Sequence, residues 1–118
     1  MRNNKFRVAL LEEADLFMSS LPLQVRRKIE YNIRRVSEGE VNAGLFKKLN
    51  DEIWEFRTLY ANIAYRLFAF WDTEQETLVI ATHGLVKKTQ KTPPREIAKA
   101  EAIRKKYFEE KSQNTEEI

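Results

Sequence analysis

Five basic side chains could act together on a phosphodiester: Arg57, Arg66, His83, Lys87 and Lys88. Arg57 lies in a segment that alternates like a β-strand, and Arg66 lies in an apolar segment typical of a central strand buried on both faces. The other three residues come at the end of a further apolar strand. Neighbouring strands are about 4.8 Å apart, so Arg57, Arg66 and the turn at Lys87 and Lys88 could converge across three strands. Converged cations can hold an RNA backbone and stabilise the charge that develops when a 2′-hydroxyl attacks phosphorus, without a metal.

Arg66 is the least expected of the five, because its segment, residues 62–72, is otherwise almost wholly apolar and aromatic. A buried cation costs on the order of several kcal/mol unless it is paired or faces a ligand. We therefore expect Arg66 either to contact a ligand or to form a structural ion pair, for which Glu55 is a candidate. Arg57 lies opposite the aromatic face of its own segment and could equally be an ordinary solvent-side arginine.

His83 and the lysines that follow it allow a catalytic and a structural interpretation. His83 is the single histidine of the chain, and its ordinary pKa near neutrality suits proton transfer. A lone histidine is equally compatible with a structural role, and a run of lysines with a solvated surface. The catalytic interpretation of His83 and the lysines is favoured if these side chains converge with the two arginines.

The excess positive charge is confined to one block of the chain. Residues 1–83 hold 12 basic and 12 acidic side chains, whereas residues 84–106 hold 8 basic and 2 acidic ones. Residues 107–118 hold 1 lysine and 4 glutamates. A positive block that begins beside His83 favours an anion-binding surface there.

Length and composition limit the class of protein. With 118 residues, we expect a single domain over residues 1–111 and a frayed tail over residues 112–118. The absence of cysteine and the single histidine argue against disulfides and a zinc site, and we expect no cofactor. No apolar run could span a membrane, and the first residues lack the apolar core of a secretion signal, so a cytoplasmic protein is expected.

Hydrophobic periodicity predicts the elements that must position these residues. Strands are expected over 5–10, 53–60, 62–72 and 77–86, and helices over 11–20, 23–38 and 93–111. Thr92 is the expected N-cap of the last helix, with Pro93 as its first residue. The order β-α-α-β-β-β-α predicts an α+β fold with helices packed on a small curved antiparallel sheet, in which the last three strands form a meander.

Several motifs in order resemble the RelE/ParE toxin superfamily, and in particular its HigB-like, phage-derived branch. The shared motifs are Lys47-Lys48-Leu49, Trp54-Glu55-Phe56-Arg57, Tyr65-Arg66-Leu67-Phe68 and the run from His83 to Ile97. The last of these is the most specific, and the resemblance covers roughly residues 5 to 108. It implies a RelE-like fold.

The resemblance also implies a function. Proteins of this kind are toxins of type II toxin–antitoxin systems, and many are ribosome-dependent endoribonucleases that cut mRNA. Their partner is usually a helix-turn-helix antitoxin encoded by an adjacent gene. Two alternatives stay open: a ParE-like inhibitor of DNA gyrase, and a non-catalytic RNA-binding module.

Site residues follow from the resemblance one by one. Arg66 matches the RelE pattern best, and Arg57, Lys87 and Lys88 match its basic positions. A catalytic tyrosine near the C-terminus could be Tyr107, although its place on the apolar side of the helix favours packing. The residues assigned to RNA binding are Lys47, Lys48, Lys91 and Arg95.

Overall fold

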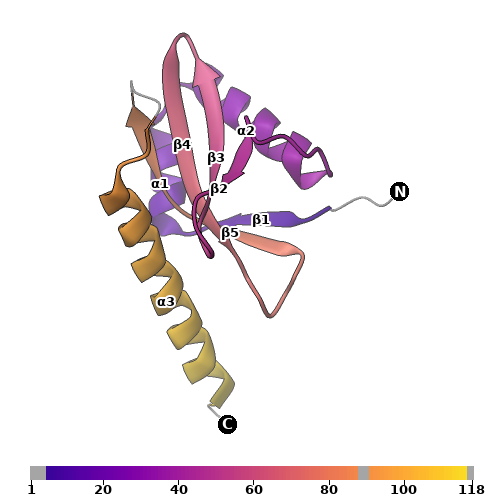
Figure 1. Cartoon of the computed structure of the whole chain (residues 1–118), viewed down its shortest axis with the longest axis vertical. Coiled ribbons are helices and arrows are strands. Elements are labelled where there is room, and N and C mark those ends of the chain that lie inside the picture. Colours follow the sequence, from indigo (N-terminus) through magenta and orange to yellow (C-terminus); the bar gives the residue numbers. More distant parts are fainter. Residues whose placement is uncertain (1–4, 88–90, 117–118) are drawn as a thin grey trace.

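A five-stranded mixed sheet forms the centre of the molecule (Figure 1). The computed structural model describes residues 5–87 and 91–116. The strands are β1 (Arg7–Leu10), β2 (Phe46–Lys48), β3 (Trp54–Tyr60), β4 (Ile63–Trp71) and β5 (Leu78–Lys87). Their order across the sheet is β1-β5-β4-β3-β2, so β1 and β2 are the edge strands.

Three helices cover the two faces of this sheet. They are α1 (Glu12–Ser20), α2 (Leu23–Ser37) and α3 (Pro94–Glu116). In Figure 1, α3 lies in front of the sheet, whereas α1 and α2 lie behind it. No helix in the described part of the chain combines the length and the apolar character needed to cross a membrane.

Alternation along the strands divides the core into two layers. On the α1 and α2 side, Ala14 and Val36 pack against buried strand residues such as Phe56 and Leu67. On the other side, Ala100 of α3 packs against a second group that comprises Ile53, Phe68, Phe70, Leu78 and Ile80. Successive strand residues point to opposite faces, so each strand contributes to both layers.

Two local features fix the pairing of β3 with β4 and the place of α1. Ala61 and Asn62 both have positive φ, 51° and 66°, as the tight two-residue turn between β3 and β4 requires. At Gly84 a Cβ atom would collide with the ring of Phe17, so glycine is what allows α1 to lie against β5. The short turn fixes the register of β3 against β4, and the glycine fixes the position of the first helix.

The predicted α+β class and the antiparallel meander β3-β4-β5 are confirmed. The wholly antiparallel sheet was wrong, because β1 pairs with β5 in parallel. The polar stretch before β3 was expected to be a connection, but Phe46–Lys48 forms the additional strand β2. The last helix begins at Pro94 instead of Pro93 and continues to Glu116, beyond the expected end at residue 111.

Candidate functional site

Arg57 and Arg66 face each other across neighbouring strands. They are direct cross-strand partners in the β3–β4 pair, and Arg66 is in turn opposite Leu85 on β5. Lys87 follows Leu85 by two residues and therefore lies on the same face of the sheet. The predicted convergence of these three cations across three strands is confirmed. Like charges placed directly opposite destabilise a sheet, so a counter-charge is needed.

The counter-charge is Glu55, a single carboxylate that the cations share. It precedes Arg57 by two residues, is 1% exposed and points to the same face. Its Oε2 lies 3.4 Å from Nε of Arg57 and 3.5 Å from Nε of Arg66. The Thr92 hydroxyl donates a hydrogen bond to its Oε1 at 2.9 Å. Thr92, expected as a helix N-cap, thus ties the start of the α3 region to the cluster.

The cluster, defined as Glu55, Arg57, Arg66 and Lys87, holds three cations around one carboxylate. Burial lowers the pKa of Arg66, as does the charge of Arg57, while Glu55 acts in the opposite direction. Burial also lowers the pKa of Lys87, with Arg66 the next cause. Arg66 Nε and Lys87 Nζ are buried and have no hydrogen-bond partner among the described residues. Unmatched buried donors with excess positive charge are suited to accept an anion.

A cavity of about 220 Å³ reaches the cluster from solvent. Its lining includes both arginines together with Gly44, Thr58, Leu59 and Ala64. The Arg57 side chain is 21% exposed whereas that of Arg66 is 4% exposed. An anion that enters the cavity therefore meets Arg57 first and the less hydrated Arg66 behind it.

The cations predicted to bind RNA are distributed around the cluster. Lys47 is exposed on β2 and is the cross-strand partner of Glu55, so it points to the cluster's face of the sheet. Lys48 is the partner of Trp54 and belongs to the opposite face. Lys91 and Arg95 are exposed at the start of the α3 region. Lys88 lies outside the described residues.

Comparison with protein families supports the resemblance found in the sequence. The model described as "Phage derived protein Gp49-like (DUF891)" matches residues 16–105, which is most of the chain. The chain belongs to the Gp49-like family of phage-derived proteins. This family is RelE-toxin-like, so the predicted kinship is confirmed at that level, and the HigB-like branch stays a prediction. No curated protein matches the chain.

The Gp49-like region also contains His83, but the structure places this residue apart from the cations. A β-bulge leaves Thr82 without a cross-strand partner, and His83 is opposite Phe68, on whose ring it stacks at 4.8 Å. Its Nδ1 lies 2.9 Å from the Thr82 hydroxyl, and its Nε2 lies 3.0 Å from Oε1 of Glu96 in α3. A carboxylate only accepts, so the neutral ring carries its proton on Nε2.

The surroundings of His83 explain its state. The side chain is 1% exposed, and burial lowers its pKa although the hydrogen bond to Glu96 acts the other way. The charged groups that act on it are Glu96, Lys99 and Glu13, none of which belongs to the cluster. The geometry makes His83 a bridge between β5 and α3, and it does not bring the imidazole to the cavity beside Arg66.

Tyr107 has a structural environment in this Gp49-like chain. Its ring packs edge-on against Phe70, and its hydroxyl donates to Oδ2 of the buried Asp72 at 2.7 Å. Burial and this carboxylate raise the pKa of Tyr107 to about 12. Lys111 contacts the same carboxylate at 2.6 Å. Packing, the favoured interpretation of Tyr107, therefore has direct support in these contacts.

Sequence patterns pointed to Arg57, Arg66 and Lys87, and also to Glu55 as a partner of Arg66. They gave no reason to include Thr92, because its pairing joins segments 37 residues apart in the chain. The alternation Glu55-Phe56-Arg57 was the available signal that a carboxylate shares the face of the arginines.

Proposed function

We propose that this protein is the toxin of a type II toxin–antitoxin system and that it cleaves mRNA on the ribosome without a metal. One observation carries the proposal: Arg57, Arg66 and Lys87 converge on one face of the sheet around a single carboxylate. Membership of a RelE-like family supports it. RNA cleavage and its dependence on the ribosome are the two components of the proposal that the experiment below tests.

The proposed reaction needs RNA, the protein and solvent water. The 2′-oxygen forms a bond to the adjacent phosphorus and its proton passes to water, while the bond from phosphorus to the 5′-oxygen breaks and that oxygen takes up a proton. Arg57 and Arg66 stabilise the negative charge on the phosphoryl oxygens, an effect worth about 3 kcal/mol per contact in comparable sites. The products are a 2′,3′-cyclic phosphate and a 5′-hydroxyl.

Lys87 is the residue we assign to proton transfer. Its lowered pKa brings the ammonium closer to neutrality, where a general acid works best. It would donate a proton to the leaving 5′-oxygen. Glu55 is already bound by two guanidinium groups and a hydroxyl, which makes it a counter-charge for the arginines and a poor base.

The surrounding exposed cations would position the substrate. Lys47, Lys91 and Arg95 are exposed, and phosphate contacts of this kind fix the register of a nucleic acid on a protein. A ribosome offers both the mRNA and the surrounding rRNA backbone. We assign these residues to RNA binding and the cluster to the reaction.

The test is induction of the gene without its partner, followed by mapping of 5′ ends in cellular mRNA. In-frame cuts within translated codons are expected, together with arrest of growth. Arg66→Ala should abolish both, and Arg66→Lys should reduce them strongly because lysine lacks the planar fork of donors. Arg27→Ala, on the exposed face of α2, is the matched control and should remain toxic.

Two outcomes would contradict the proposal. A DNA damage response with intact mRNA would identify a gyrase inhibitor instead. A folded Arg66→Ala variant that still cuts mRNA would show that Arg66 has only a structural role.

A further inference from the structure

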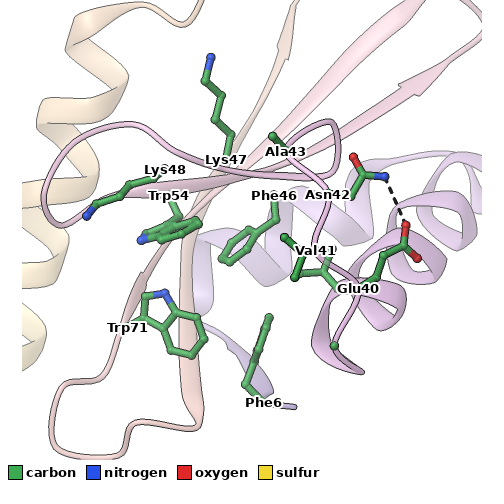
Figure 2. A pocket seen from close by; sticks show the side chains of 12 residues that line it. Phe6, Glu40, Val41, Asn42, Ala43, Phe46, Lys47, Lys48, Trp54 and Trp71 are labelled. Atoms are coloured by element: carbon green, nitrogen blue, oxygen red, sulfur yellow. Dashed lines mark hydrogen bonds between the residues drawn. The ribbon is translucent and has the colours of Figure 1, made fainter. Parts of the chain in front are cut away.

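A second cavity, of about 380 Å³, opens on the sheet face opposite the cluster (Figure 2). It lies between strand β2, the segment that follows α2, and the ends of β1 and β4. Four aromatic side chains form most of its wall: Phe6, Phe46, Trp54 and Trp71. We call this cavity the aromatic cleft.

The aromatic cleft presents rings that are only partly covered. Phe46 stacks on Trp54 with centroids 4.7 Å apart and planes 23° apart, and Phe6 meets Trp71 edge-on at 4.9 Å. All four side chains are half-buried, so their remaining surface faces the cavity. Figure 2 shows the two indoles and the Phe46 ring gathered along one side of the opening. Neither indole N–H donates a hydrogen bond to another described residue.

Two lysines connect this cleft to the cluster around the edge of the sheet. Lys48 is the cross-strand partner of Trp54, on the cleft side, whereas Lys47 is the partner of Glu55, on the cluster side. Both are exposed on a three-residue edge strand, and Figure 2 shows the Lys47 side chain directed away from the cleft. Adjacent cations therefore lie on both faces of one narrow edge.

The acidic side of the rim does not cancel this charge. Glu40 is bound by Arg35 at 2.6 Å and also accepts from the Asn42 amide. The Asn42 side-chain oxygen in turn accepts from the Gly44 backbone N–H. The polar groups of this segment thus bond to each other, and the rim that stays available is the one with the lysines.

We propose that the aromatic cleft binds an unpaired base of single-stranded RNA, while Lys48 and Lys47 bind the phosphates beside it. The strand would pass over the edge at β2 and reach Arg57 and Arg66 on the other face. Partly exposed rings beside a cationic path are the features by which proteins hold single strands through stacking. Recognition should tolerate different bases, because the polar side chains of the rim are already paired. The inference rests on the proposed function, since it names a contact with the same RNA.

Tryptophan fluorescence can report binding in the cleft, because the two tryptophans of the chain, Trp54 and Trp71, both line it. The purified protein is titrated with 2′-O-methyl hexanucleotides of each base, which lack the 2′-hydroxyl and cannot be cut by the proposed reaction. Saturable quenching of tryptophan fluorescence is expected with all four. Binding is thereby measured separately from cleavage.

Variants locate the binding site. Trp54→Ala should weaken binding by about tenfold or more, and Trp54→Phe should retain most of it because stacking persists. Lys48→Glu should weaken binding and reduce its salt dependence. Lys28→Glu, on exposed α2, is the matched control for charge and should bind normally. Lys48 is exposed, so this variant remains informative even where Trp54→Ala does not fold.

The outcomes separate this inference from the proposed function. Tryptophan fluorescence that does not change on addition of the oligonucleotides would overturn the cleft assignment. This result is expected if the cleft instead binds an apolar side chain of a partner protein. Quenching that is undiminished in Trp54→Ala and in Lys48→Glu would place the RNA elsewhere and would also overturn it. Cleavage of mRNA in cells stays an independent measurement in either case.

Discussion

The Glu55 carboxylate lies 3.5 Å from Nε of Arg66, and both side chains are almost completely buried. The same carboxylate lies 3.4 Å from Arg57, and Lys87 adds a further positive charge on this face. One anion therefore holds in place more positive charge than it neutralises. An arrangement of this kind is organised for an anion before that anion arrives.

Glu55→Gln should destabilise the fold, because it leaves Arg66 buried without a counter-charge. The expected loss in free energy of unfolding is about 3 kcal/mol, the cost of breaking a buried pair from one side. Urea unfolding measures it. Glu52→Gln removes an exposed carboxylate that pairs with the half-buried Arg104 at 3.3 Å, and should cost less than about 1 kcal/mol. Equal losses in the two variants would contradict a buried, shared carboxylate.

Lys87→Met should stabilise the protein and abolish growth inhibition together. The Nζ atom is buried without a hydrogen-bond partner among the described residues, and an apolar side chain of similar length avoids that cost. The expected gain is about 1–3 kcal/mol, the penalty of an unsatisfied buried group. Lys28→Met, on exposed α2, should change neither property. A destabilised but still toxic Lys87→Met protein would refute both assignments.

The same lysine predicts a pH dependence of stability. Its pKa is lowered in the folded protein, so the unfolded chain binds more protons between the folded pKa and the ordinary value of about 10.4. The free energy of unfolding of the wild type should therefore rise with pH over that window, relative to Lys87→Met. Chemical unfolding at a series of alkaline pH values measures this difference, and parallel curves would show that Lys87 is ordinarily hydrated.

The arginine in an apolar strand was the strongest signal in the sequence, and the structure shows why. Alternation puts Glu55 and Arg57 on one face, and a tight turn fixes which residue of β4 lies opposite them. The expected pair between Arg66 and Glu55 is confirmed at 3.5 Å. Short-range periodicity and local turns were sufficient for this part of the site.

Contacts between distant segments could not be predicted in this way. The parallel pairing of β1 with β5 depends on packing across the whole chain, and the three residues of β2 carry too little periodicity to identify a strand. The pairing of Thr92 with Glu55 and of His83 with Glu96 depends on where α3 docks. The aromatic cleft combines residues from both ends of the sheet, so no local pattern contained it.

His83→Gln should remove an acid-sensitive part of the stability. Burial lowers the pKa of His83 in the folded protein, so the unfolded chain binds the proton more readily below about 6.5. The wild type should therefore lose stability as pH falls from that value, and His83→Gln should lose less. The folded variant should keep cutting mRNA, since the imidazole lies apart from the cluster. Parallel acid-unfolding curves, or loss of cleavage with an intact fold, would contradict this role.

The last prediction concerns the proposed antitoxin, a helix-turn-helix protein encoded beside this gene. Part of the positive charge of α3 is used internally, because Lys99 pairs with Glu13 and Arg104 pairs with Glu52. Other cations of α3 are exposed and, among the described residues, form no ion pair with another element. They include Arg95, Lys105 and Lys106. They could attract an acidic surface and so speed encounter with it.

Co-expression with the neighbouring reading frame, followed by a pull-down, should recover a tight complex. Its association should slow markedly between ~0.05 and ~0.5 M salt, because the Debye length shrinks several-fold over that range. Replacing Lys105 and Lys106 with glutamate should slow association further, whereas Lys28→Glu changes the same kind of charge on α2 and should have a smaller effect. Stopped-flow rates that are independent of salt, or equal in these variants, would show that α3 does not steer the partner.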